Sequence, residues 1–251
     1  MYASAVEPHW HEIRPMVIDS AGIFDPPPPP VFNMSDKKSK YYQEVIAIKN
    51  AIDSLTPEQK HIAEFWDDNP FKMNVSGHVM FATKKFSPPG HWMNIVGIGA
   101  KAAKADFKTT VAAYAETAIA LFDAFISCWD EKYRSELIRP ETYINKYIDD
   151  KWMPTLQTPP FPEYTSGHSV ASSTTAEILT HLFGENFAYE DTVEKEFGLP
   201  TRKYQSFKQA ASEAAMSRLW GGIHYMPAIR NGSMQGRNLG SFIVKTLKTQ
   251  K

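Results

Sequence analysis

Three short segments of the chain carry side chains suited to holding an oxyanion and moving protons around it. The first contains Lys132 and Arg139, followed by Pro140. On one helix these two cations would be two turns apart and would project from the same face, roughly 10 Å from each other. Proline disfavours helical geometry in the residue before it, so the pattern predicts that the helix ends at Arg139. Taken alone, this segment is also typical of a solvated helix end with cations near the negative end of the dipole.

The second segment places Gly167 between Ser166 and His168. Thr165 or Ser166 can cap a following helix, and Gly167 allows a backbone N–H to come close to a ligand. Unpaired N–H groups and the positive end of a helix dipole favour anions. An imidazole next to such an anion can donate or accept a proton near neutral pH, which makes His168 a candidate catalytic residue.

The third segment begins with Ser217 and Arg218 and ends with His224. The pair Gly221 and Gly222 predicts the end of a helix, so that His224 comes from a turn. A capping glycine pair followed by an incidental histidine would explain this segment by itself. Together, the three segments supply three cations, a loop with a hydroxyl group and a glycine, and two histidines in a set order.

This ordered set resembles the three-part signature shared by vanadium-dependent haloperoxidases and type-2 phosphatidic acid phosphatases. The resemblance extends over about residues 129 to 240. The residues that carry it are Lys132, Arg139, Ser166, Gly167, His168, Arg218 and His224. Trp129 and Phe161 are similar to the halide-pocket positions of vanadium chloroperoxidases, and they favour the bacterial haloperoxidase-like branch.

The resemblance implies a vanadate cofactor with His224 as the ligand of the vanadium, and a proton-transfer role for His168. The further oxyanion-binding groups that it implies are Lys132, Arg139, Ser166, Gly167 and Arg218. Trp129 and Phe161 would shape the halide pocket, although both are equally typical of an ordinary core. The implied reaction uses hydrogen peroxide to oxidise a halide to hypohalous acid, without haem or flavin.

The chain departs from the family pattern at two positions. Thr165 stands where the family has proline before the Ser-Gly-His tripeptide, and Ala228 stands where it has an aspartate, four residues after the second histidine. A carboxylate at that place would fix the tautomer of His224 and raise its basicity. Without it, a backbone carbonyl, Asn231 or a residue from elsewhere in the chain must orient the ring.

Two other classes of function fit the same residues. A soluble acid phosphatase would bind phosphate in place of vanadate and act on a phosphate ester. His224 would then form a phosphohistidine and His168 would protonate the leaving group. The third class is a non-enzymatic, anion- or peptide-binding helical protein with a degenerate site, and the loss of the aspartate at Ala228 favours it.

The pattern of apolar residues around these segments predicts helices almost throughout. A capping box of Thr56 and Gln59, with Pro57 between them, predicts the start of a helix that runs toward Trp66. The full set of predicted helices is 41–52, 57–66, 91–105, 109–137, 141–148, 170–183, 204–220 and 232–247. Alternating strand patterns are scarce. The expected fold is therefore all-α, a helical bundle of the vanadium haloperoxidase and acid phosphatase type.

Residues 26–30 are five consecutive prolines, which form a polyproline II rod and cannot lie inside a helix or a central strand. We interpret them as a rigid strap in preference to a recognition segment for a proline-binding partner. The predicted organisation is an extended N-terminal segment with this strap at 1–36 and a helical haloperoxidase-like domain at 37–251.

Composition narrows the remaining classes of function. The 27 Lys and Arg residues nearly balance the 28 Asp and Glu residues, and a net charge of −1 argues against a nucleic-acid-binding protein. The single cysteine, Cys128, excludes a disulfide framework or a multi-cysteine metal site.

No stretch approaches the roughly 18–20 apolar residues that cross a bilayer, so we expect a soluble protein without membrane insertion. The N-terminus does not resemble a signal peptide; export to the periplasm or outside the cell after removal of such a peptide is left open. The chain is short for the family that it resembles, which also leaves a homodimer open.

Overall fold

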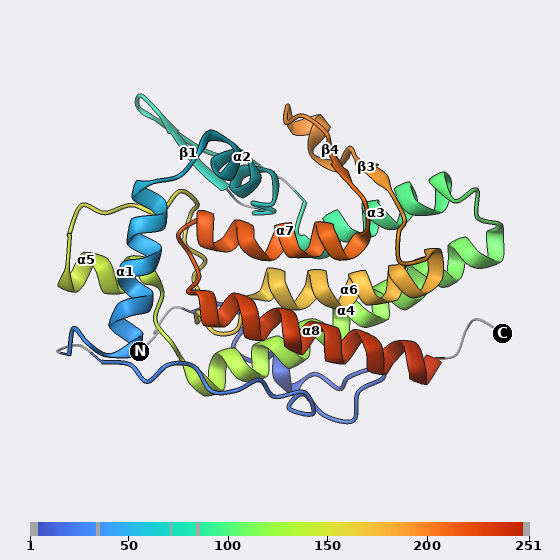
Figure 1. The fold of residues 1–251 in the computed structure, drawn as a ribbon, viewed down its shortest axis with the longest axis horizontal. Coiled ribbons are helices and arrows are strands. Elements are labelled where there is room, and N and C mark those ends of the chain that lie inside the picture. The colour runs from blue at the N-terminus through green and yellow to red at the C-terminus, as the bar shows by residue number, and fades with distance from the viewer. Residues whose placement is uncertain (1–4, 34–35, 71, 84–85, 248–251) are drawn as a thin grey trace.

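The residues after Asp106 form α4 (Phe107–Ser135), which lacks glycine and proline along its length. The Asp106 side chain accepts the N–H of Thr109 at 2.8 Å and so caps the start of this helix. In this computed structural model, residues 5–33, 36–70, 72–83 and 86–247 are described (Figure 1). Helix α4 runs through the core and contacts α3 (Pro88–Ala102), α6 (Gly167–Phe183) and α8 (Met226–Leu247).

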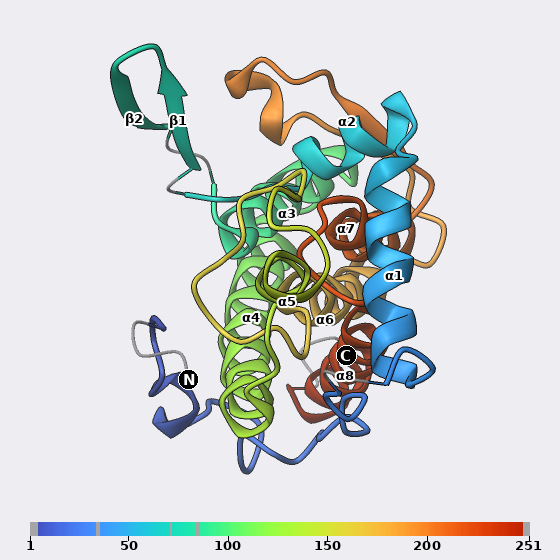
Figure 2. The same ribbon diagram turned by 90° about the vertical axis from the view of Figure 1, so that its left-hand side faces the viewer.

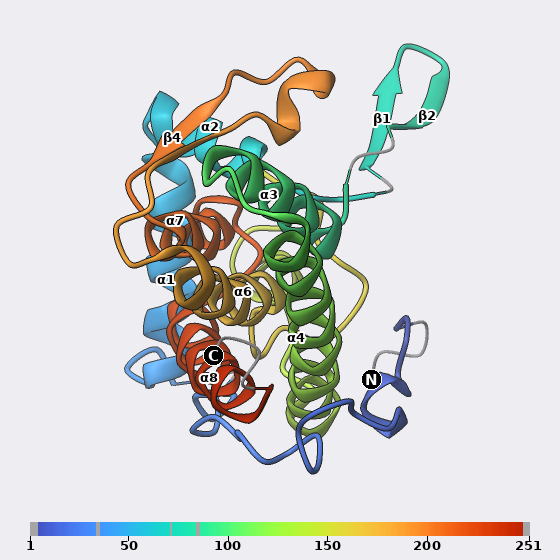
Figure 3. The same ribbon diagram turned by 90° about the vertical axis from the view of Figure 1, so that its right-hand side faces the viewer.

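Helix α6 lies in the middle of the bundle, between α4 on one side and α7 (Phe207–Trp220) and α8 on the other (Figures 2 and 3). Its residues from Ser169 to Ala176 are all buried, which is typical of a helix covered on every side. Because Ser166 and Gly167 begin this helix, the centre of the bundle determines where the Ser-Gly-His segment lies.

Helix α8 approaches α6 closely because glycines face it at every fourth residue. A Cβ atom built on Gly232 would lie 3.0 Å from the carbonyl oxygen of Ser166, and one on Gly240 would lie 2.7 Å from that of Thr174. Gly236, between them, contributes its carbonyl oxygen as acceptor for the Thr174 hydroxyl at 3.1 Å. The glycine stripe therefore presses α8 against the start of α6, next to Ser166.

Shorter helices cover this centre: α1 (Lys40–Asp53), α2 (Pro57–Phe65) and α5 (Pro140–Tyr147). The capping box predicted before α2 is confirmed, with reciprocal hydrogen bonds between Thr56 and Gln59. The mostly helical bundle agrees with the expected all-α fold. Two short turns of 3-10 helix, η1 (Trp10–Glu12) and η2 (Val193–Phe197), complete the helical segments.

Two antiparallel hairpins were not predicted. Strands β1 (Lys72–Ser76) and β2 (Val79–Thr83) pair through a turn at Gly77, whose φ of 57° favours glycine. This hairpin projects away from the helices (Figure 2). The second pair is β3 (Tyr189–Asp191) with β4 (Arg202–Tyr204), each three residues long. Strands this short leave too few alternating positions to be recognised in the sequence.

Three helix boundaries differ from the prediction. Helix α4 ends at Ser135 and not at Arg139, because Glu136 adopts the left-handed conformation with φ of 47°. The prediction that Lys132 and Arg139 share one helix face is therefore wrong. Helix α8 begins at Met226, six residues before the predicted start at Gly232, because that glycine serves close packing inside the helix. Helix α6 begins at Gly167, three residues before the predicted start.

The N-terminal segment lies along the helices and is pinned to α4 by a buried carboxylate. Asp123 accepts the backbone N–H groups of Met16, Val17 and Ile18 at 2.7, 2.8 and 3.0 Å. Near the proline run, the Tyr164 hydroxyl donates to the carbonyl oxygen of Pro27. These contacts agree with a strap; the division of the chain at residues 36 and 37 stays a prediction.

One stretch, Phe107–Tyr147, is long and apolar enough by length and composition to cross a membrane, and 56% of its most apolar window is buried inside the protein. It comprises α4, α5 and the bend between them. A core helix meets the same criterion, as α4 does here. The expected absence of membrane insertion stays a prediction.

Candidate active site

Lys132, in the last turns of α4, is fully buried and faces the loop that leads into α6. Its Nζ donates to the carbonyl oxygens of Pro162, Glu163 and Thr165 at 2.9, 3.1 and 2.5 Å. Burial, reinforced by the nearby charge of Arg139, lowers the pKa of Lys132 to about 7. The lysine thus organises the loop, and its charge is only partly compensated by carbonyl dipoles.

Arg139 reaches the same loop from a different element. It is the N-cap residue of α5, directly before Pro140. Its Nε donates to the carbonyl oxygen of Phe161 at 2.9 Å, and its Nη1 donates to that of Ile223 at 2.8 Å. The same Nη1 lies 2.9 Å from Nε2 of His224. The bend after α4 therefore still brings both predicted cations to one place, although not on one helix.

His224 comes from the turn after α7, as predicted, and is buried. Its Nδ1 lies 2.9 Å from Oε1 of Glu163, which also accepts the backbone N–H of Tyr225 at 2.9 Å. Because Oε1 acts as an acceptor for Tyr225, we infer that Nδ1 carries the proton. Nε2 is then left with its lone pair, directed toward Arg139. Burial and the charges of Arg139 and Lys132 hold the pKa of His224 well below its usual range, so the ring is neutral at pH 7.

Glu163 answers the question raised by the missing aspartate at Ala228. Asn231, one of the predicted substitutes, donates instead to the hydroxyl of Tyr164 at 2.7 Å. Ala228 is fully buried, and its carbonyl oxygen accepts the N–H of Ser166 at 3.2 Å. The orienting carboxylate is therefore supplied by the loop before α6 and not by α8. Burial raises the pKa of Glu163 to about 7, against the lowering effect of the neighbouring cations.

Ser166 is the N-cap of α6, as predicted, and Gly167 is the first helical residue. The Ser166 Oγ accepts the N–H of Ser169 at 3.3 Å and its hydroxyl at 2.9 Å. A Cβ atom on Gly167 would lie 3.7 Å from the ring of Trp129, so the glycine lines the open space beside that ring. The start of α6 thus presents a helix N-terminus to the cavity.

His168 follows on α6 and faces a buried chain of alternating carboxylates and imidazoles. Its Nε2 lies 3.5 Å from Asp68, which is bound by Nδ1 of His91 at 2.8 Å. Nε2 of His91 lies 3.0 Å from Asp191. Burial and the charge of Arg218 lower the pKa of His168 to about 4. For His91, burial is outweighed by the two aspartates, which raise its pKa to about 10.

Arg218, near the end of α7, is the third buried cation. Its Nη2 donates to the carbonyl oxygen of Trp66, and its Nε donates to Oγ of Ser217 at 3.0 Å. Burial lowers the pKa of Arg218 to about 10, although Asp67 and Asp68 act in the opposite direction. The aspartates and His91 were not predicted, since only the fold brings 67–68, 91 and 191 together.

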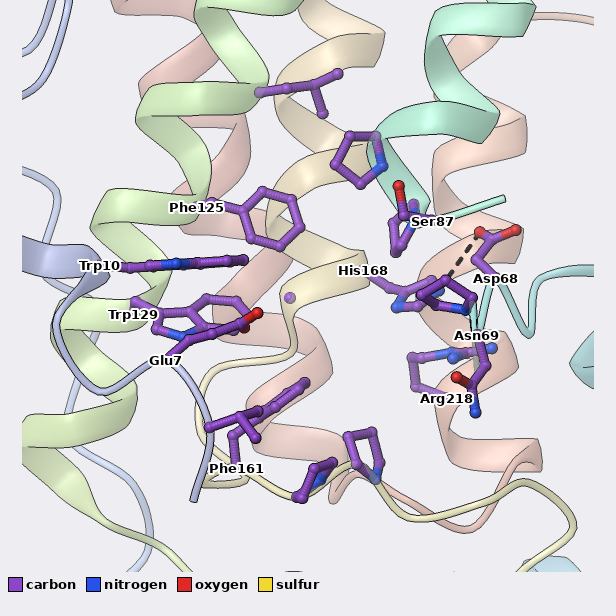
Figure 4. Close-up of a pocket in the computed structure, with 18 of the residues that line it drawn as sticks. Glu7, Trp10, Asp68, Asn69, Ser87, Phe125, Trp129, Phe161, His168 and Arg218 are labelled. Atoms are coloured by element: carbon purple, nitrogen blue, oxygen red, sulfur yellow. Dashed lines mark ion pairs between the residues drawn. The ribbon is translucent and has the colours of Figure 1, made fainter. Parts of the chain in front are cut away.

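These groups border a cavity of about 930 Å³. Figure 4 shows Trp10, Phe125, Trp129 and Phe161 on one side, facing His168, Asp68 and Arg218 on the other. The remaining cradle residue that lines it is His224, together with Gly167. Lys132, Arg139 and Ser166 lie behind this lining.

The predicted halide-pocket residues Trp129 and Phe161 both line the cavity, with ring centroids 5.0 Å apart. The Lys132 ammonium lies 5.8 Å from the Trp129 ring and 5.3 Å from the Phe161 ring. The buried Nε1 of Trp129 has no hydrogen-bond partner among the described residues. Trp10, which the sequence did not identify, covers Trp129 with ring centroids 4.6 Å apart.

Known proteins share both this fold and these sequence features. Residues 112–250 match the family described as "VCPO second helical-bundle domain". A solved structure of a bacterial vanadium-dependent iodoperoxidase is 50% identical, with a TM-score of 0.89, and the match covers 96% of this chain and 58% of that one. No curated protein matches.

More distant structures show the same fold. The holo form of a bacterial vanadium-dependent chloroperoxidase is 18% identical with a TM-score of 0.72, and its apo form is 18% identical with a TM-score of 0.73. These matches cover 96% of this chain and 54% and 56% of those chains. The chain thus spans little more than half the length of the solved structures that it matches.

Proposed function

The chain belongs to the vanadium haloperoxidase superfamily, and from this we propose that it binds vanadate and oxidises a halide with hydrogen peroxide to hypohalous acid. The observation that carries the proposal is the convergence of Arg139 and Glu163 on His224, which leaves Nε2 as the only ring nitrogen with a lone pair. Iodide is the halide to test first, because the iodoperoxidase is 50% identical.

The residues present suit an oxyanion. Lys132, Arg139 and Arg218 are all buried, and burial lowers the pKa of Lys132 to about 7 and of Arg218 to about 10. Clustered buried cations are costly unless an anion compensates them. A bound oxyanion would restore these charges through short, charge-assisted hydrogen bonds. The same argument holds for phosphate, so the charges support an oxyanion in general.

His224 would hold the vanadium through Nε2, because Nδ1 is occupied by Glu163. Lys132, Arg139 and Arg218 would neutralise the oxyanion, while Ser166 and Gly167 would add a hydroxyl group and a backbone N–H. When bound, vanadate supplies a Lewis acid that activates peroxide for attack by the halide. The contribution of the protein is to fix these donors in a buried site before the reaction begins.

His168 would move the proton of the incoming peroxide. Its pKa of about 4 leaves the ring neutral at pH 7 and able to accept a proton. Asp68, 3.5 Å from Nε2, would then stabilise the imidazolium. The chain through His91 and Asp191 holds Asp68 in place for this purpose.

The halide would bind beside the aromatic rings. The Nε1–H of Trp129 is a buried donor that has no protein partner in the described structure, and the charge of Lys132 lies 5.8 Å from the ring. Phe161 closes the other side and limits access of water. A donor, a positive charge and a dry wall are the features that a halide requires.

The test loads the purified protein with orthovanadate and follows triiodide formation from iodide and hydrogen peroxide. We expect turnover that requires vanadate and is abolished in His224→Ala. Hydrolysis of p-nitrophenyl phosphate without vanadate is measured in parallel. Phosphatase turnover that vanadate inhibits, without any halide oxidation, would reject the proposal in favour of the phosphatase.

A further inference from the structure

The cavity is much larger than the substrates of halide oxidation require. Its volume is about 930 Å³. A water molecule occupies about 30 Å³ of the liquid, and peroxide and a halide ion are each comparable to one or two waters. Sites for drug-sized organic molecules measure about 300–1,000 Å³. The cavity therefore has room for an additional organic molecule beside the oxyanion site.

The extra space lies at an apolar end, away from the cations. Ala118, Leu121, Phe122 and Phe125 line it from α4, and Met93 lines it from α3. At 1.5 Å per residue, Ala118 lies about 16 Å along the helix from Trp129. No lysine or arginine of the described residues lines this end, since Arg218 is the only such cation on the cavity wall.

The aromatic side chains between the two ends present both edges and faces to the cavity. Trp10 meets Phe125 edge to face at 5.7 Å between centroids, while it lies tilted over Trp129 at 4.6 Å. Such groupings bind a further aromatic ring by offset or edge-to-face contacts in addition to excluding water. A neutral aromatic molecule suits this wall better than a charged one, since the apolar end offers no counter-ion.

We propose that this cavity binds a neutral, electron-rich aromatic compound, which is halogenated while it is held next to the oxyanion site. The inference rests on the proposed haloperoxidase function, which supplies hypohalous acid, HOX. The compound R–H and HOX give R–X and water. A ring carbon donates its electron pair to form the C–X bond as the O–X bond breaks, and the departing oxygen leaves with the ring proton as water.

The test uses 1-naphthol as the aromatic probe and Ala118→Trp to fill the apolar end. Ala118 is exposed to the cavity, so the larger side chain enters open space without displacing a packed neighbour. Ala115→Trp is the matched control, because Ala115 is exposed on the same helix but does not line the cavity. Both variants should unfold at the temperature of the wild type.

Binding is measured first, by calorimetry with vanadate-loaded protein and without peroxide or iodide. We expect saturable binding of 1-naphthol at one site in the wild type and Ala115→Trp, and at least tenfold weaker binding in Ala118→Trp. In turnover, Ala118→Trp should lower kcat/KM for iodination of 1-naphthol at least tenfold. Triiodide formation without naphthol should stay within twofold of the wild type.

Two outcomes overturn the inference: wild-type protein that does not bind 1-naphthol, or Ala118→Trp that binds and iodinates it as the wild type does. In either case the halogen is transferred in bulk solvent. Triiodide formation without naphthol binding would reject only this inference. Naphthol binding without any halide oxidation would keep the aromatic site and reject both the haloperoxidase activity and the transfer step.

Discussion

Replacement of Glu163 by alanine should weaken vanadate binding, because this one carboxylate orients the ring that would hold the vanadium. Its Oε1 accepts hydrogen bonds from Nδ1 of His224 and from the N–H of Tyr225, both at 2.9 Å and both buried. Partners of metal-bound histidines typically contribute about 10- to 100-fold to affinity or activity. We therefore expect the dissociation constant of vanadate to rise about 10- to 100-fold, which corresponds to about 1.4–2.7 kcal/mol.

Glu163→Gln separates orientation from charge. Glutamine keeps a carbonyl oxygen that can accept from His224 and Tyr225, so a role in orientation predicts a smaller loss of vanadate affinity than in Glu163→Ala. Glu196→Ala, on the exposed surface, is the control for a lost carboxylate. Binding is measured by calorimetry with orthovanadate alone, so that the readout does not depend on turnover.

Adding Ala228→Asp to Glu163→Ala tests whether the orienting group has moved from α8 to the loop. A carboxylate at 228 stands where the family pattern has one, and we expect it to restore part of the lost vanadate affinity. The reasoning is refuted if Glu163→Ala folds normally and binds vanadate with the affinity of the wild type. His224 would then be held by its packing and by Arg139 alone.

Three further predictions concern stability. Asp123→Ala should cost about 1–3 kcal/mol and speed proteolysis within 5–33, because three backbone N–H groups lose their acceptor; unchanged cleavage would contradict this. Gly236→Ala should cost about 1–3 kcal/mol in urea unfolding, since its Cβ would force α8 away from α6, and an unaltered midpoint would show that the helices can separate freely. Because Asp68 and Asp191 raise the pKa of His91 to about 10, the protonated ring stabilises the fold fully below about pH 6.5. This contribution should decline as the pH rises toward 10, and His91→Gln should remove that part of the slope.

Local signals in the sequence predicted the helices better than their ends. The start of α2 was recognised because Thr56 and Gln59 satisfy each other's backbone within four residues. The end of α4 was placed too late, since proline restricts only the residue before it and a helix can end earlier. Glu136 ends it in a left-handed conformation that no glycine or asparagine announced. The start of α8 was missed because glycine was read as a local signal, whereas here it serves a contact with α6.

The site divides along the same line. The residues of the three segments were found because their types and order are specific, and they meet at one cavity. Glu163 lay inside the second segment but was not identified, because its partner His224 is distant in the chain and only the fold joins them. The Asp68–His91–Asp191 chain had no recognisable spacing at all. Partners set by tertiary structure need the coordinates, whereas residues fixed by a motif do not.

The cations of the site also build the loop that carries Glu163. Lys132 binds three carbonyl oxygens of that loop, Arg139 binds the carbonyl oxygen of Phe161, and the N–H of Glu163 itself donates to Leu137 at 2.9 Å. Removal of Lys132 would therefore disturb the loop together with any bound oxyanion. A loss of vanadate binding in Lys132→Ala would not separate these effects. Glu163→Ala leaves the contacts of the loop backbone in place, so a change in affinity there reports on His224.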